Sequence, residues 1–318
     1  MEIMHPTPSL GLYSRPRKAA RFVLALLVPL LVLLAAAPPA SAGTLERIKE
    51  SGKLNFGYGD SRPFSYKDDS GNPAGFGVAL CGKVADALKA RLGLPALTVN
   101  YVPVTGDEGL QAVADGKIDM LCDATVPSLK ARKRVSFSIP VYAGGVGAVV
   151  RADASTRLKD VLSGRVPPTS PTWRGNADVL LRESTLSMIP GSRAARALDA
   201  RAKELQLVPK FVPVNNVATG LTRVLDGRSN AFFAERSVLL DAVKRNGSRD
   251  LEVLDRYFTH ETLAFAVARD DSDFRLAVDT ALSQLFDSDG FGDIYAQSFG
   301  PITESTLAMF RFAAPPAE

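Results

Sequence analysis

Histidine and cysteine are scarce in this chain of 318 residues. There are two of each, and His260 is the one histidine beyond the first 42 residues. Zinc sites and Ser-His-Asp catalytic sets depend on histidine or on clusters of cysteine. The sequence therefore argues against a zinc protein and against a serine hydrolase, and we expect no cofactor.

An excess of charge of one sign is also absent once the first 42 residues are set aside. The whole chain carries 38 Lys and Arg against 34 Asp and Glu, a net charge of +4. Four basic groups and one acidic group lie in residues 1–42, so the remaining 276 residues hold 34 basic and 33 acidic groups. This balance gives no basic stripe for a nucleic-acid partner. The length suits two domains better than one.

Long apolar runs are lacking, except for one near the start of the chain. Residues 22–37 are almost wholly apolar, follow a basic segment that ends at Arg21, and precede Ala40-Ser41-Ala42. The run is shorter than the ~20 residues that span a bilayer, and Pro38-Pro39 ends it. We expect residues 1–42 to be a signal peptide, and the mature protein to be periplasmic and without a membrane span.

The two cysteines, Cys81 and Cys122, form an even set in a chain that we expect to be exported. An oxidising compartment favours a disulfide between them. Cys81 falls on a predicted helix, and Cys122 ends a predicted strand of the same half of the chain. Closing this loop of about 42 residues would add roughly 4 kcal/mol of stability. The alternative is two buried thiols.

Strands and helices alternate along the chain, which favours parallel sheets flanked by helices. Hydrophobic periodicity and turn residues set the expected boundaries. In the first half, strands are expected at residues 54–58, 97–104 and 118–122, with helices at 78–92 and 108–115. In the second half, strands are expected at 186–189, 210–214, 230–233 and 261–268, with helices at 194–205, 217–225, 235–245, 274–285 and 291–299.

The order of these segments predicts two lobes joined by two crossings of the chain. Residues 43–148 would begin the first lobe, residues 149–260 would form the second, and residues 261–318 would return to complete the first. Two crossings make a hinge, and a hinge over a cleft is a means of trapping a small ligand. A segment rich in Pro, Ser and Thr at 164–176, which holds Trp173, is expected to be an insertion in the second lobe or a contact surface for a partner.

Several short motifs occur in an ordered set along the chain, and the order carries more information than any one motif. They are Leu54-Asn55-Phe56-Gly57-Tyr58, Pro63-Phe64-Ser65-Tyr66, Gly75-Phe76, Gly116-Lys117-Ile118-Asp119-Met120 and Arg134-Val135-Ser136-Phe137-Ser138-Ile139-Pro140-Val141-Tyr142.

This set resembles the bacterial periplasmic solute-binding proteins, family 3, which serve ABC importers of polar amino acids, and the resemblance covers residues 44–300. It implies a two-lobed type II fold, in which each lobe is a mostly parallel sheet flanked by helices. It also implies a monomer that captures a small polar solute and delivers it to an inner-membrane ABC permease.

The resemblance places one part of the ligand site in the first lobe. It implies ligand contacts for Phe64, Asp123, Ala124 and Thr125. The family arginine that clamps the ligand's carboxylate falls at Ala131 in this sequence. Arg132 lies one residue out of register, and it is either a replacement for that arginine or part of a solvated basic face.

The other part of the site is implied in the second lobe. Gly191-Ser192-Arg193 occupies the place of a family turn that opens a helix and receives a carboxylate. Arg193 is either a replacement for the cation missing at Ala131 or an exposed residue of the first helical turn. Glu235 stands where the family has an acid for the ligand's ammonium group, and its alternative role is to favour a helix N-terminus.

Gly59-Asp60 and Gly109 stand where family members that bind glutamate or aspartate carry arginine, so an acidic amino acid is disfavoured. Two alternatives to transport remain open at this point. One is an exported sensing or interaction protein that no longer transports, and the other is a lyase that resembles cyclohexadienyl dehydratase, with Glu235 or Asp123 as the acid or base.

Overall fold

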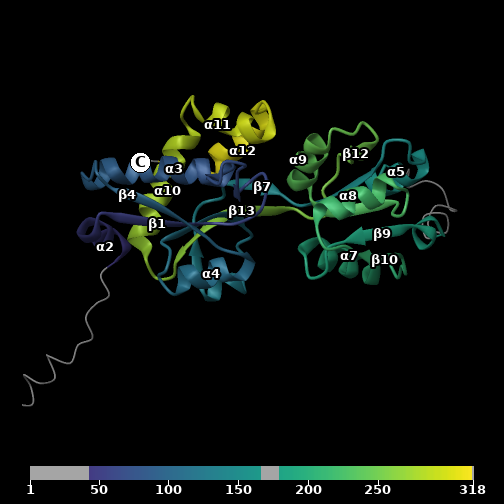
Figure 1. The fold of residues 1–318 in the computed structure, drawn as a ribbon, viewed down its shortest axis with the longest axis horizontal. Coiled ribbons are helices and arrows are strands. Elements are labelled where there is room, and N and C mark those ends of the chain that lie inside the picture. The colour runs from purple at the N-terminus through teal and green to yellow at the C-terminus, as the bar shows by residue number, and fades with distance from the viewer. Residues whose placement is uncertain (1–42, 166–178, 317–318) are drawn as a thin grey trace, which may run out of the picture. The chain divides into compact units, whose positions relative to one another are not determined.

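The computed structural model describes residues 43–165 and 179–316 (Figure 1). The expected signal peptide and Trp173 lie outside the described residues. In the part of the chain that is described, none of the helices is both long enough and apolar enough to cross a bilayer.

The first lobe is built on a sheet in which residues from both ends of the chain meet. Its strand order is β4-β1-β5-β13-β6, and β7 also pairs with β13. β4, β1 and β5 run parallel, whereas β13 is antiparallel to β5, β6 and β7. The strands are β1 (Lys53–Tyr58), β4 (Thr98–Pro103), β5 (Met120–Thr125), β6 (Val135–Phe137), β7 (Tyr142–Gly144) and β13 (Glu261–Ala268).

Alternating side chains of this sheet supply two apolar cores, one on each face. Met120 and Cys122 of β5 join a large cluster under α3 and α10, whereas Leu121 between them joins a cluster under α4. Figure 1 shows α3 and α10 on one side of the sheet and α4 on the other. The helices of this lobe are α2 (Thr44–Ser51), α3 (Phe76–Leu92), α4 (Gly106–Ala114), the 3-10 turn η1 (Ala131–Lys133), α10 (Ser272–Phe286), α11 (Phe291–Phe299) and α12 (Glu304–Ala313).

The segment between β1 and α3 forms a short hairpin of β2 (Tyr66–Lys67) and β3 (Pro73–Ala74). It packs closely onto the start of α3, where the Gly77 amide donates to the Phe64 carbonyl at 2.7 Å. A Cβ on Gly77 would lie 2.2 Å from the Cys122 carbonyl oxygen. Glycine at this position therefore allows α3 to approach the end of β5.

The second lobe repeats this plan with a five-stranded sheet in the order β10-β9-β11-β8-β12. β10, β9 and β11 are parallel, and β8 is antiparallel to β11 and β12. The strands are β8 (Val146–Arg151), β9 (Thr185–Met188), β10 (Lys210–Pro213), β11 (Ala231–Glu235) and β12 (Leu251–Val253).

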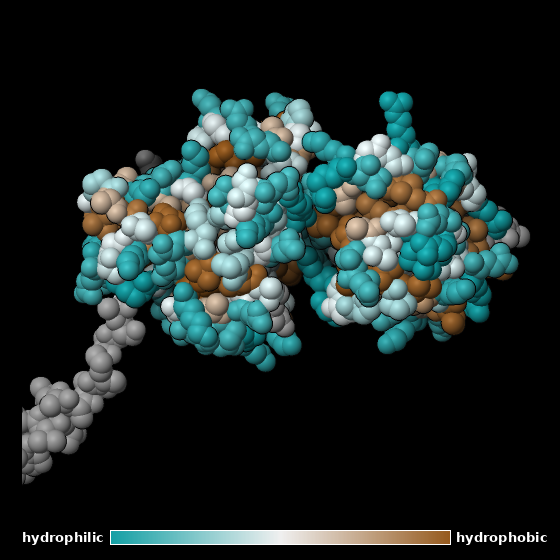
Figure 2. Space-filling view, viewed as in Figure 1, coloured by the Kyte–Doolittle hydropathy of each residue, from teal (hydrophilic) through white to brown (hydrophobic). Residues whose placement is uncertain are grey.

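Helices cover both faces of this sheet as well. Phe233 packs with the cluster that includes α5 and α7, whereas its neighbour Phe232 packs with α8 and α9. These helices are α5 (Thr156–Ser163), α7 (Arg193–Glu204), α8 (Val217–Leu225) and α9 (Arg236–Asn246). Figure 2 shows hydrophilic side chains over much of the face in view, with apolar patches on both lobes.

The α/β fold with two lobes is as expected, but each sheet is mixed rather than mostly parallel. Three strands of each sheet are parallel, and the others join antiparallel. A parallel neighbour needs a crossover connection, usually a helix. β8 and β13 instead enter their sheets directly from the other lobe, so they run against their neighbours β11 and β5.

The two crossings between the lobes lie against each other. Glu261 of β13 pairs with Gly144 of β7, and the Val146 amide donates to the Thr259 hydroxyl at 3.0 Å. Gly145 has a φ of +157°, and a Cβ there would lie 1.8 Å from the Thr259 carbonyl oxygen. Only glycine fits between the crossing segments at this point.

Candidate ligand-binding site

Each of the two sheets carries a carboxylate towards the C-terminal end of one parallel strand. The two strands, β5 and β11, occupy equivalent places in their sheets. Asp123 follows the buried residues Met120–Cys122 of β5, and Glu235 follows the buried residues 231–234 of β11. β5 and β11 both lie next to the strand that crosses from the other lobe. Ligands of open α/β sheets bind outside the carboxyl ends of the parallel strands, so both acids lie where a ligand is expected to bind.

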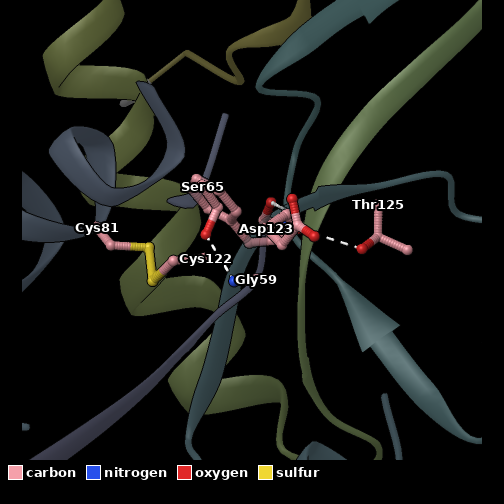
Figure 3. Close-up of a disulfide and its surroundings, with 8 residues drawn as sticks. Gly59, Ser65, Cys81, Cys122, Asp123 and Thr125 are labelled. Atoms are coloured by element: carbon pink, nitrogen blue, oxygen red, sulfur yellow. Dashed lines mark hydrogen bonds between the residues drawn. A yellow bond between two sulfur atoms is a disulfide. The ribbon is translucent and has the colours of Figure 1, made fainter. Parts of the chain in front are cut away.

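Asp123 lies over the end of β1, where the absence of a side chain at Gly59 makes room for its carboxylate. A Cβ on Gly59 would lie 2.6 Å from Asp123 Oδ2, and the Gly59 amide donates to Ser65 Oγ at 2.8 Å (Figure 3). Asp123 Oδ1 is buried and has no hydrogen-bond partner within the described residues. A buried polar atom without a partner is costly, so this oxygen is a place for a ligand's donor.

The protonation of Asp123 is shifted by its surroundings. Burial raises the pKa of its carboxyl group to about 7, against hydrogen bonds from the Ser61 hydroxyl and the Ala124 amide. The Arg193 guanidinium, from the second lobe, also lowers this pKa, and Asp60 raises it. Asp123 is therefore partly protonated near neutral pH.

The expected disulfide between Cys81 and Cys122 is confirmed (Figure 3). It joins α3 to β5, with the two Cα atoms 6.1 Å apart. Because Cys122 directly precedes Asp123, the disulfide holds the strand end that presents this carboxylate.

In the second lobe, Arg193 lies between two carboxylates. Its Nη2 is 3.5 Å from Glu235 Oε2, and its Nη1 makes a close ion pair with Glu261. The other oxygen of Glu235, Oε1, accepts the Gly145 amide at 2.8 Å. The structure thus brings together the predicted residues Arg193 and Glu235, and it ties both to the segments that cross between the lobes.

Ser192 positions Arg193 by starting helix α7. Its hydroxyl accepts the Ala195 amide at 3.1 Å, which satisfies one of the unpaired N–H groups of the first turn. Arg193 is the first residue of the helix. Burial raises the pKa of Glu235, and the nearby carboxylate of Glu261 raises it further. The hydrogen bond from the Gly145 amide and the charge of Arg193 lower this pKa.

Other residues that the resemblance singled out make their contacts outside this cluster. Arg132 is exposed, with Nε donating to the Pro127 carbonyl at 3.3 Å and its guanidinium 5.5 Å from the Phe137 ring centre. Phe64 is 3% exposed and packs edge-on against Tyr142 at 5.0 Å in the aromatic core. Ala131 is buried in the apolar cluster under α4.

Ala124 and Thr125 lie on β5 beyond Asp123 and are both partly buried. The Thr125 hydroxyl donates to the backbone carbonyl of Asp123 at 3.1 Å, as Figure 3 shows. This bond fixes the strand end, and it occupies the hydroxyl hydrogen that a ligand would otherwise accept.

Glu261 is the member of the cluster that sequence reasoning did not identify. It opens β13, and sequence reasoning assigned it only to the start of a return strand. An acidic residue beside a chain crossing was the available signal, but its pairing with Arg193, 68 positions earlier, depends on the fold.

Comparison with known proteins agrees with the fold and with the motifs. The L-glutamate/L-aspartate-binding protein of Pseudomonas aeruginosa is 26% identical over 260 residues, which cover 81% of this chain and 80% of the relative. The cyclohexadienyl dehydratase of the same species is 29% identical over 143 residues, 45% of this chain and 51% of the relative.

A solved structure of an ancestral cationic amino acid solute-binding protein aligns with a TM-score of 0.63 and 26% identity, over 80% of this chain and 99% of that chain. This likeness identifies the two-lobed fold as that of type II periplasmic binding proteins. The model of a family described as bacterial extracellular solute-binding proteins, family 3, matches residues 54–301. The chain therefore belongs to the bacterial extracellular solute-binding proteins of family 3.

Proposed function

We propose that this protein is the periplasmic binding component of an ABC importer and captures a small polar solute with an amine group, an amino acid or a close analogue. The observation that carries this proposal is the set of carboxylates at the strand ends of both lobes, Asp123 on β5 and Glu235 on β11. An ammonium group that bound between them would replace lost hydration with charged hydrogen bonds.

The relatives support a solute of this size and polarity. One is named for L-glutamate and L-aspartate, and a structural neighbour is described as binding cationic amino acids. An acidic ligand fits this chain poorly, because Asp123, Glu235 and Glu261 are all acidic and one cation, Arg193, pairs with two of them. We infer that the chain is exported after removal of residues 1–42, acts as a monomer, and delivers its solute to an inner-membrane permease.

The test is a ligand screen by thermal unfolding, on protein purified from the periplasm after export of the full chain. The panel contains the proteinogenic amino acids and simple aliphatic amines. A ligand at a hundred times its dissociation constant adds about 2.7 kcal/mol to the free energy of unfolding. The Glu235→Gln variant, which keeps the shape of the side chain without the charge, should lose most of the response.

Small-angle scattering with and without the hit gives a second readout, because closure around a solute makes a two-lobed protein more compact. Absence of any thermal shift across the whole panel would argue against the proposal. Pull-down of a sensor kinase rather than a permease from solubilised membranes would redirect it towards sensing.

A further inference from the structure

The cluster between the strand ends has more negative than positive charge. Asp123, Glu235 and Glu261 supply three carboxylates, and Arg193 is the cation that acts on Asp123 and pairs with Glu235 and Glu261. Two of the carboxylate oxygens, Asp123 Oδ1 and Glu235 Oε2, are buried without a hydrogen-bond partner in the described part of the chain. With all three carboxylates ionised, which a bound cation would favour, the site has two negative charges in excess. It also has two acceptors in need of donors.

The three positions where a cation for a ligand's carboxylate was expected are apolar, exposed or occupied. Ala131 has no charge and is buried in the core under α4. Arg132 is exposed and donates to the Pro127 carbonyl. Arg193 has both terminal nitrogens directed at carboxylates, so a ligand's carboxylate would have to displace Glu235 or Glu261 and approach the negative charge that remains.

We propose that the ligand is an aliphatic dication, with an amine or guanidinium group at each end and no carboxylate group. The inference rests on the proposed function, and it narrows the solute from amino acids in general to amines of this kind. One end of the ligand would donate to Asp123 Oδ1 in the first lobe, and the other to Glu235 Oε2 in the second. Such a ligand would carry the two positive charges that the site lacks.

A metal ion is a poor alternative as the cation. Within residues 43–165 and 179–316, no three His, Cys, Asp or Glu side chains converge closely enough to hold one. The acids are instead distributed over two lobes, at the ends of β5 and β11 and at the start of β13. A cation with two separated charged ends can reach carboxylates placed in this way, whereas a single ion needs its ligands close around it.

The experiment compares pairs of compounds that differ in the carboxylate alone. Binding of agmatine against arginine, and of cadaverine against lysine, is measured by titration calorimetry on the exported protein. We expect the decarboxylated member of at least one pair to bind about tenfold tighter or more, because an unpaired buried carboxylate in the complex is costly.

Three variants separate this proposal from a carboxylate clamp. Asp123→Asn and Glu235→Gln should each weaken amine binding by about tenfold or more, since each removes one partner of a buried charge pair. Arg193→Gln should tighten amine binding, because it removes a cation that competes for Glu235 and Glu261. The control is Arg196→Gln, on the exposed face of α7, where Arg196 donates to the Gly191 carbonyl, and it should have no effect.

Tighter binding of arginine and lysine than of their amines, or loss of all binding in Arg193→Gln, would overturn the proposal while leaving the proposed function intact. Binding of a neutral amino acid, with no binding of any of the amines, would also overturn the proposal and leave the proposed function intact. If no compound of either kind binds, the proposed function fails together with the inference.

Discussion

The two lobes end corresponding strands on an acid but surround that acid differently. In the second lobe, β9 is followed by a turn and helix α7, whose first residue, Arg193, lies 3.5 Å from Glu235. In the first lobe, β1 is followed by Gly59-Asp60-Ser61 and a hairpin, so Asp123 meets a hydroxyl and a second acid. The segment after the neighbouring strand therefore decides whether a strand-end carboxylate receives a cation from its own lobe.

The first lobe also has a covalent brace, and the second lobe, over its described residues, has none. Its strand end is tied to α3 by the Cys81–Cys122 disulfide, whereas the described part of the second lobe contains no cysteine. The strand end that presents Asp123 is thus braced by the disulfide, whereas Glu235 is held by Arg193 and by the Gly145 amide. The differences between the lobes lead to three predictions.

The largest expected effect is the loss of stability when the disulfide is removed. Replacing both cysteines, as in Cys81→Ala with Cys122→Ala, should lower the free energy of unfolding by about 4 kcal/mol, because the disulfide restricts a loop of about 42 residues in the unfolded chain. Urea unfolding followed by circular dichroism measures the change.

Hydrogen exchange shows whether the loss is confined to one lobe. Amides of β5 and α3 should lose protection, and those of β9 and β11 should keep theirs. Equal loss in both lobes would contradict the view that the disulfide braces the first lobe alone.

The next effect concerns protons. Asp123 has a folded-state pKa of about 7, above the unfolded value of about 4. The folded protein without ligand therefore binds more protons than the unfolded chain between pH 4 and 7, and the contribution of Asp123 to stability falls as pH rises through that window. The shift of about three pKa units corresponds to a total change of about 4 kcal/mol, at roughly 1.4 kcal/mol per unit.

Thermal unfolding of the unmodified protein and of Asp123→Asn at a series of pH values isolates the contribution of Asp123 to stability. Asp60, Ser61 and Arg193 act on the same carboxylate and remain in both proteins. The difference between the two melting curves should change between pH 4 and 7 and be constant outside that range. A constant difference throughout would show that Asp123 titrates normally.

The smallest expected effect lies at the crossing of the chain. Gly145→Ala places a methyl group against the Thr259 carbonyl oxygen, where the distance to a Cβ is 1.8 Å. We expect a loss of about 1–3 kcal/mol, as is typical of overpacking. The matched control is Gly82→Ala in α3, where nothing lies within 4 Å of a new Cβ; it should stabilise by about 0.5–1 kcal/mol. Similar melting temperatures for the two variants would argue against a tight crossing.

Most of the fold could be predicted from the sequence because its strongest signals are local. The expected strand at residues 54–58 and the expected helix at 194–205 differ from β1 and α7 by about one residue. Glycines that end helices, such as Gly93 with its φ of +65°, give signals of the same local kind. The pairing of Cys81 with Cys122 followed from compartment and position.

Pairings between distant segments could not be predicted in the same way. β6, β7 and β12 have three residues each, too few for a periodic pattern, and they exist because neighbouring strands need partners. Glu261 gained its role only when β13 was placed beside β7. Phe64 follows the family pattern, yet its ring is held by Tyr142 and Phe299, from segments far along the chain.

The close contact of the two crossings limits how the lobes can move. Gly144 pairs with Glu261, and the Phe258 amide donates to the Val146 carbonyl at 2.7 Å. Two segments of the chain that are bonded in this way form a ribbon. Such a ribbon resists stretching and sideways sliding, and it bends most easily across its flat face. The two lobes should therefore rotate relative to each other about a single axis. A solute that releases Arg193 from Glu261 would loosen the ribbon at its edge.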